Sequence, residues 1–305
     1  MDEAMTMPAH GPPLEARLRE ALARSDAAHA AIGPILRHLL SDHDEALFTD
    51  EIAARVRGMI RHLAQQFAAA TARGPDEREI DALAADLARD EALVRHCHAC
   101  ALEGQLSARL EQRSAIDPVL SPLLQALIAS DDAAVAATAM AALAAQARFV
   151  QQQRRMELPL GELPADRFDR VVSEGARFFA DGDSAAALRA GYDEAATRIA
   201  LFARLVEGMG AGARAALSLP HAGLALFLAG TAVAARQDRD LVVVAASEVQ
   251  PVRLALALRA AALNPGEVAE QVALVQPDAA LPDGFATLGA EQAAALLTGR
   301  ASGRR

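Results

Sequence analysis

Residues 119–148 are the part of the sequence that most limits how this chain can fold. They read VLSPLLQALIASDDAAVAATAMAALAAQAR. Apolar residues recur every three or four positions on both sides of a Ser-Asp-Asp turn, which is the spacing of a helical face. Asp131 and Asp132 place negative charge at the start of the second helix, where the helix dipole favours it. The segment therefore predicts a hairpin of two helices.

The composition of the whole chain favours the same class of structure. Alanine and leucine dominate, and Ala, Leu, Arg, Glu and Gln are the best helix formers, while aromatic residues make up 3% of the chain and Trp is absent. The run Val242–Val244 could form a strand on β-propensity alone, but no partner strand is evident, and we expect a helix there. We predict an all-α protein of helical hairpins, stacked as a degenerate α-solenoid or gathered in a multi-helix bundle.

Glycine and proline divide the chain into segments. MELPLGELPA at 156–165 contains two prolines and a glycine, and we interpret it as the joint between two halves. The predicted organisation is a disordered N-terminus at 1–13, a helical domain at 14–157, a linker at 158–165, a second helical domain at 166–298 and a disordered basic tail at 299–305. Predicted helices cover 44–70 and 76–112, with a joint near Asp90 and a possible cap at Asp76, and then 166–180, 184–207, 219–236, 239–247, 250–263 and 266–275. A further periodic segment at 14–40 is expected to break at Gly33-Pro34.

The hairpin at 119–148 resembles a HEAT-repeat unit. The resemblance rests on Leu120, Pro122, Leu123, Leu124, Leu127, Ile128, Asp132, Val135, Ala139, Ala142 and Leu143. Ala136 stands where that family usually carries Arg, so the Asp–Arg ladder that links family units is not expected here. The resemblance covers about a tenth of the chain and implies helical hairpin geometry and a surface that binds other proteins.

The charge balance limits the choice of partners. The formal net charge is −10, and every one of the 30 basic residues is Arg. We expect no nucleic-acid partner, because phosphate binding needs a positive surface. The uncharged run between Arg214 and Arg236 contains Pro220, which leaves too short a helix to cross a bilayer, and we expect a buried core helix there. With no secretory signal in the sequence, we expect a cytoplasmic protein and no membrane partner.

HCHAC at 96–100 holds both cysteines of the chain. On a helix, Cys97 and Cys100 fall within an apolar arc, and we interpret them as core residues. One alternative is a zinc or copper site formed by His96, Cys97 and Cys100, although a closed zinc site needs a fourth ligand that no nearby motif supplies. The other is a redox switch, although such cysteines usually lie at a helix N-terminus.

No catalytic or cofactor-binding motif is found, and we expect neither a cofactor nor enzymatic activity. The expected function is a non-enzymatic scaffold or adaptor that binds another protein, and the negative charge favours a basic partner. Candidate contact residues are Arg55, Arg57, Arg61, Arg154 and Arg155. The alternative is a helical sensor that responds to metal or oxidant through HCHAC. An enzyme of unknown class is a third possibility, which a buried convergent polar pocket would support.

Overall fold

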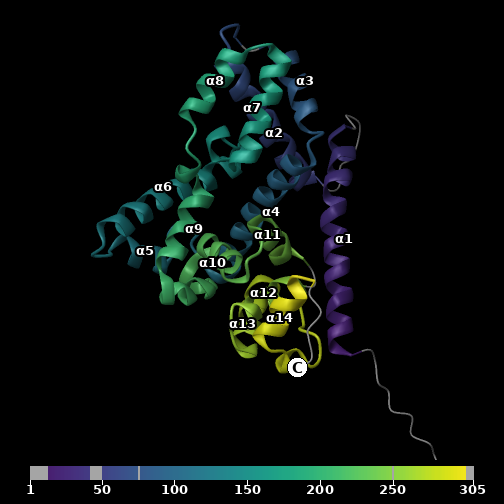
Figure 1. Cartoon of the computed structure of the whole chain (residues 1–305), viewed down its shortest axis with the longest axis vertical. Coiled ribbons are helices and arrows are strands. Elements are labelled where there is room, and N and C mark those ends of the chain that lie inside the picture. The colour runs from purple at the N-terminus through teal and green to yellow at the C-terminus, as the bar shows by residue number, and fades with distance from the viewer. Residues whose placement is uncertain (1–12, 42–49, 75, 249–250, 300–305) are drawn as a thin grey trace, which may run out of the picture.

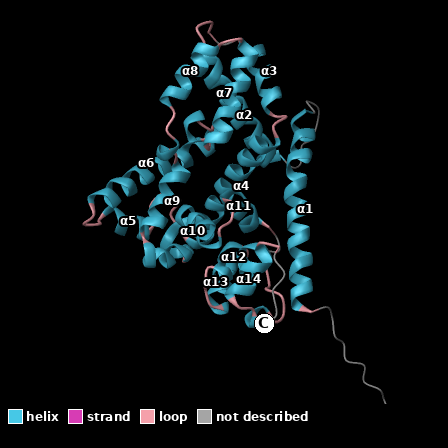
Figure 2. Ribbon diagram, viewed as in Figure 1, coloured by secondary structure: helices cyan, strands magenta, loops and turns pink. Residues whose placement is uncertain are grey.

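The computed structural model describes residues 13–41, 50–74, 76–248 and 251–299, and within these ranges the fold is all-α (Figures 1 and 2). No strand occurs among these residues, and Val242–Val244 lies in a helix, as expected. The many packed helices are compatible with a helical repeat or a bundle. The predicted disordered ends at 1–13 and 299–305 lie outside the described residues except for Pro13 and Gly299.

The helices follow one another with short connections. They are α1 Leu14–Ser41, α2 Asp50–Ala70, α3 Glu77–Leu87, α4 Glu91–Ser114, α5 Pro122–Ile128, α6 Ala133–Arg155, α7 Ala165–Phe179, α8 Gly182–Gly191, α9 Arg198–Gly208, α10 Leu219–Ala235, α11 Arg239–Ser247, α12 Val252–Ala260, α13 Pro265–Val275 and α14 Ala290–Leu297. Short 3₁₀ turns are η1 Leu160–Glu162, η2 Glu194–Ala196, η3 Gly210–Leu217 and η4 Phe285–Thr287.

Acidic and hydroxyl side chains begin many of these helices. Asp76 accepts a hydrogen bond from the Arg78 amide at the start of α3, and Asp90 accepts two from the start of α4. Asp76 was predicted as a cap, and a joint between two helices was predicted near Asp90. The predicted hairpin is also present: Ser121 caps α5, and Asp132 caps α6 after the Ser-Asp-Asp turn. Such side chains accept from backbone N–H groups that have no partner within the helix.

Helix α4 passes through the middle of the molecule and contributes to two hydrophobic cores (Figure 1). The first core lies between α2, α3, α7, α8 and the N-terminal half of α4. The second core lies between α5, α6, α9 to α14 and the C-terminal half of α4. Helix α1 runs along one side of the molecule and adds Leu36 to the first core and Leu18 and Leu22 to the second. Any polar side chain on the inner face of α4 is therefore enclosed by protein.

Two of the expected helices have different boundaries in the structure. Helix α1 continues through Pro34 instead of ending there. Proline removes the hydrogen bond to the carbonyl four residues earlier, but Ala30 and Pro34 are both exposed, so water can satisfy that carbonyl. The single helix expected at 184–207 is divided into α8, η2 and α9, because Asp193 and Thr197 each cap a new helical start.

The segment proposed as a linker lies against α2. Leu158, Leu160 and Leu163 are buried in the first core. The Leu158 amide donates to Nδ1 of His62 at 3.1 Å, and the Leu160 amide donates to the Gln66 side chain at 2.9 Å. The division into two domains at this segment stays a prediction.

The uncharged segment before Arg236 forms α10, which is buried as expected and is broken at Gly223. There the backbone has φ 68° and ψ 167°, a conformation that is accessible essentially to glycine alone. A Cβ atom at this position would lie 2.8 Å from the Cβ of Ser121, the residue that caps α5. The break in α10 therefore makes room for the base of the α5–α6 hairpin.

One described helix, α6, is long and apolar enough to cross a membrane by length and composition, with 28% of its apolar window buried. The pair η3 and α10 passes the same test together, but its two parts are bent by 111°. A single such helix is weak evidence for a membrane span, and the structure is compatible with a soluble protein.

Candidate functional site

The HCHAC segment lies in α4 with His96, Cys97 and Cys100 all buried. Both cysteines are free thiols and belong to the first core, in agreement with their interpretation as core residues. Burial raises the pKa of Cys97 well above its usual value, so this residue stays a neutral thiol. Within the described part of the chain, no group of three or more His, Cys, Asp and Glu side chains is placed to hold a metal ion.

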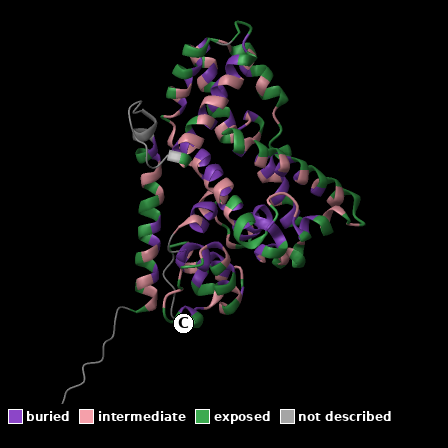
Figure 3. Ribbon diagram, turned by 180° about the vertical axis from the view of Figure 1, so that it is seen from behind, coloured by how far each residue is buried: buried purple, intermediate pink, exposed green. Residues whose placement is uncertain are grey.

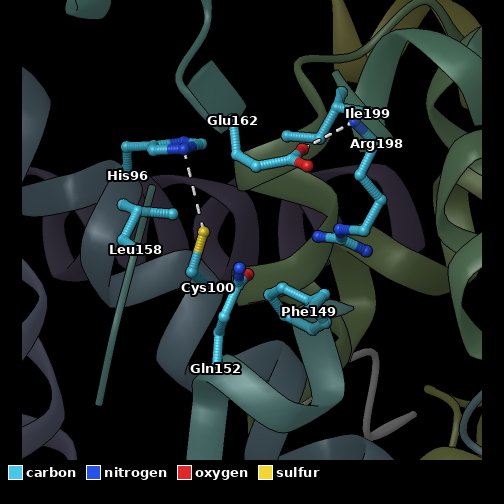
Figure 4. Close-up of a pocket in the computed structure, with 8 residues that line it drawn as sticks. All are labelled: His96, Cys100, Phe149, Gln152, Leu158, Glu162, Arg198 and Ile199. Carbon is cyan, nitrogen blue, oxygen red and sulfur yellow. Dashed lines mark hydrogen bonds between the residues drawn. The ribbon is translucent and has the colours of Figure 1, made fainter. Parts of the chain in front are cut away.

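His96 connects Cys100 to a carboxylate from a distant part of the chain. Its Nδ1 lies 2.8 Å from Oδ2 of Asp240, which is in α11. Its Nε2 lies 3.7 Å from Sγ of Cys100, as Figure 4 shows. A carboxylate can only accept a hydrogen bond, so Nδ1 carries the proton toward Asp240 and Nε2 faces the sulfur. Cys100, His96 and Asp240 therefore form a hydrogen-bonded chain of thiol, imidazole and carboxylate, which we call the Cys100 relay.

The electrostatic surroundings favour a charged imidazole. Burial, the largest single effect, lowers the pKa of His96, but Asp240 and Cys100 together raise it to about 10 through their charges and hydrogen bonds. Burial raises the pKa of Asp240, but His96, Arg239 and Arg167 lower it further, so the carboxyl stays ionised. Because the two groups are buried in contact with each other, each stabilises the charged form of the other.

A second buried ion cluster lies about one turn further along α4. Glu103 is 1% exposed and accepts hydrogen bonds from both terminal nitrogens of Arg198 at 2.8 Å. Arg239 in α11 donates to the same carboxylate at 2.8 Å. The guanidinium of Arg198 also lies 3.7 Å from the centre of the Phe149 ring. Burial raises the pKa of Glu103, and the two arginines lower it well below its ordinary value. This ion cluster joins α4, α6, α9 and α11.

A small cavity lies between the Cys100 relay and the ion cluster (Figure 4). It has room for about one water molecule. His96 and Cys100 lie on one side, and Glu162, Arg198 and Ile199 on the other, with Phe149, Gln152 and Leu158 completing the wall. A cavity of this size can hold a very small molecule beside the thiol, but not a metabolite.

The relay and the ion cluster were only partly visible in the sequence. His96, Cys100 and Glu103 have the spacing i, i+4, i+7, which places them on one helical face. A charged residue on the buried face of a helix is a signal that a partner is required. Nothing in the sequence identified the partners, which are Asp240, Arg198 and Arg239.

The α5–α6 hairpin is the second feature with a possible function, because it projects from the body of the molecule (Figures 1 and 3). Helix α6 carries no charge from Ala133 to Ala147, and its outward face is nonetheless exposed. That face consists of Ala133, Ala134, Ala137, Met140, Ala141 and Ala144, and Met140 is 51% exposed. We call these six residues the α6 face.

A groove runs beside the α6 face, between the hairpin and the end of α9. Its volume is about 290 Å³, and it is lined by Leu127, Ala134, Val135, Thr138, Arg204, Leu205, Gly208 and Met209. Among these lining residues Arg204 alone is charged. Grooves with such apolar walls bind the apolar stripe of an amphipathic helix.

The arginines proposed as partner contacts are distributed over two areas. Arg55 binds the carboxylate of Glu51 and donates to the Gln153 carbonyl at 2.9 Å, so it lies near Arg154 and Arg155, which are exposed. Arg61 instead pairs with Glu77 and Asp81 across the α2–α3 contact. Arg57 is exposed and also has an interaction within the chain. Their role in binding stays a prediction.

Comparison with protein-family models, with curated proteins and with solved structures gives no match for this chain. No family is therefore assigned.

The contact between α1 and α4 predicts that stability falls in acid. Burial, together with the nearby His29, lowers the pKa of His98 to about 4, and burial and Arg95 lower that of His29. The unfolded chain binds protons at these residues more readily, so stability is lost as the pH falls below about 6.5. We expect urea unfolding to show a loss of roughly 2 kcal/mol between pH 7 and pH 5. His98→Gln should reduce this loss, and an unchanged pH dependence in the variant would contradict the assignment.

Proposed function

We propose that the protein is a non-enzymatic interaction module that binds an amphipathic helix of another protein along the α5–α6 hairpin. The observation that carries the proposal is the α6 face, an exposed helical surface without charge on a projecting hairpin. A soluble helix normally turns charged residues to solvent, and exposed apolar patches mark interaction sites. The resemblance of this hairpin to a HEAT unit supports the same function.

The small side chains of the α6 face favour a helical partner. Alanine allows the backbones of two helices to approach closely, and the adjacent groove offers a second apolar surface beside it. Leu127, Val135 and Met209 are only partly buried in the groove and can be covered by the partner's apolar stripe. Burial of such side chains contributes about 25 cal/mol for each Å² removed from water.

The charge around the hairpin favours a basic segment next to that stripe. Asp131 and Asp132 are both exposed at the tip of the hairpin, and the net charge of the chain is −10. Complementary charge at the edge of an interface mainly increases the rate of association and sets the orientation of the partner. The proposed partner is therefore a helix with an apolar stripe and basic residues, and the proposed location is the cytoplasm.

The test uses the full chain as bait, because the hairpin depends on the body of the protein for its packing. Proteins retained by the wild type are identified by mass spectrometry and compared with those retained by Met140→Glu. Met140 is exposed, so this change should alter stability by less than about 0.5 kcal/mol. It places a charge in the middle of the α6 face. We expect at least a tenfold weaker capture of a stoichiometric partner, which is roughly 1.4 kcal/mol of binding free energy.

Ile35→Glu is the matched control. Ile35 is 57% exposed and lies on α1, away from the hairpin. Capture that is lost with Met140→Glu and kept with Ile35→Glu supports the proposal, provided that the retained protein binds through a helical segment. Equal capture by both variants would contradict it. Sedimentation of the wild type would show whether a second copy of the chain occupies the α6 face instead.

A further inference from the structure

We propose that Cys100 is a peroxide-reactive thiol, that His96 and Asp240 activate it, and that the cavity beside it admits hydrogen peroxide but not larger hydroperoxides. This inference does not depend on the α6 face or on a protein partner. It depends on three observations: the order of the Cys100 relay, the cavity at its sulfur end and the difference between the two cysteines.

The relay has the geometry that activates a nucleophile. The thiolate is the reactive form of cysteine, and a base within reach of the thiol, held by a third group, is the arrangement that produces it. Here Nε2 of His96 lies 3.7 Å from Sγ of Cys100, and Asp240 holds the opposite ring nitrogen at 2.8 Å. Because the charged form of His96 is favoured, the thiol proton rests on Nε2, which gives a thiolate beside an imidazolium, with the guanidinium of Arg198 lining the same cavity.

The cavity determines which oxidant can reach the sulfur. Cys100 is 3% exposed, and the space next to it accommodates about one water molecule. Hydrogen peroxide has only one oxygen atom more than water and can form the same hydrogen bonds. The wall residues Gln152, Glu162 and Ile199 are partly exposed, so they form the mouth of the cavity. A hydroperoxide with an aromatic substituent does not fit without opening of the helices.

The proposed step balances in atoms and electrons. The Cys100 thiolate attacks one peroxide oxygen, the S–O bond forms and the O–O bond breaks. The leaving hydroxide takes the proton from Nε2 of His96 and departs as water. The sulfur loses two electrons and becomes a sulfenic acid, the peroxide gains two electrons, and His96 returns to its neutral form.

Cys97 provides an internal control for this chemistry. It lies in the same helix and core as Cys100 but does not line the cavity, and no hydrogen bond from His96 to it is present in the described structure. Cys97→Ser leaves Cys100 as the sole thiol, whereas Cys100→Ser leaves Cys97. The two variants therefore separate a reaction of the relay from a general reaction of buried thiols.

The experiment follows loss of the free thiol in the folded full-length Cys97→Ser protein at neutral pH. After exposure to hydrogen peroxide and removal of the oxidant, the chain is unfolded and the remaining thiol is titrated with a maleimide. This readout is needed because the chain also contains 7 methionines, which peroxide oxidises too. The rate of thiol loss in folded Cys97→Ser is compared with the rate in the same variant in urea and with the rate in folded Cys100→Ser. It is also compared with the rate in folded Cys97→Ser when cumene hydroperoxide replaces hydrogen peroxide.

We expect Cys100 to react at least about tenfold faster in the folded chain than in urea, because a positioned base contributes at least that much. We expect cumene hydroperoxide to react at least about tenfold more slowly than hydrogen peroxide, and Cys97 in folded Cys100→Ser to be nearly inert. Addition of His96→Asn or Asp240→Asn should remove most of the acceleration while circular dichroism stays helical.

A folded rate equal to or below the rate in urea would overturn the proposal, and so would equal rates for the two hydroperoxides. If the His96 and Asp240 variants do not fold, two comparisons still decide the question, because both keep His96 and Asp240 in place. They are the rate in folded protein against the rate in urea, and the rate with hydrogen peroxide against the rate with cumene hydroperoxide.

Discussion

Glu103→Ala is expected to lower the free energy of unfolding by about 3–5 kcal/mol, one of the largest effects predicted for a single substitution in this chain. The carboxylate is 1% exposed and binds Arg198 and Arg239, whose side chains are 4% and 11% exposed. Its removal leaves two guanidinium groups in the protein interior without their anion. Such groups cannot lose their charge, because arginine is not deprotonated in proteins. Chemical denaturation at neutral pH measures the loss.

Glu207→Ala is the control for this prediction. Glu207 is exposed on α9 and makes no ion pair with any described residue, so its removal should change stability by less than about 0.5 kcal/mol. Combining Glu103→Ala with Arg198→Met should recover part of the loss, since a buried ion group can often be replaced by apolar side chains. If Glu103→Ala alone lowers the free energy of unfolding by less than about 1 kcal/mol, Glu103 does not bind Arg198 and Arg239 in solution.

Gly223→Ala is the second substitution with a large expected effect, about 2–4 kcal/mol of destabilisation. The backbone at Gly223 has φ 68° and ψ 167°, which a residue with a side chain adopts only with strain. The added methyl group would also lie 2.8 Å from the Cβ of Ser121. Because Ser121 caps α5, relief of this overlap must move the start of the hairpin or the break in α10.

The measurement for Gly223→Ala is denaturation combined with hydrogen exchange, which should show faster exchange in α5 than in α2. Gly161→Ala is the matched control, because no atom lies within 4 Å of a Cβ placed there and its backbone is not left-handed. A neutral effect of Gly223→Ala would mean that α10 can adopt a continuous helix in that region, contrary to the structure.

The helical hairpin and several helix starts could be predicted from the local sequence. The hairpin that Gly223 supports was predicted from the residues between 119 and 148, and the cap at Asp76 and the joint near Asp90 were predicted as well. Each of these features is decided by side chains within about four positions of a backbone N–H group, so the local sequence carries the information. The expected break at Pro34 was wrong, because an exposed carbonyl can bind water instead of the missing donor.

The candidate sites were predictable to a smaller extent. The sequence indicated that HCHAC lies on an apolar helical face and that 119–148 forms a hairpin, and both are present in the structure. It did not indicate that α6 would leave its apolar face exposed, because alanine is tolerated equally in a core and on a helix surface. Burial of α6 depends on which neighbours reach it, and its most extensive contacts are with α5 and α9.

By itself, then, the sequence determined the helices, many of their starting residues and the apolar environment of the two cysteines, since these depend on local hydrogen bonding and helical periodicity. The tertiary structure alone decided which cysteine acquired a chemical partner. His96 and Asp240 are separated by 144 positions, and Glu103 and Arg239 by 136. Such pairs form because α11 packs across α4, and the direction in which one helix crosses another is set by the packing of the whole core, not by the residues that happen to meet there.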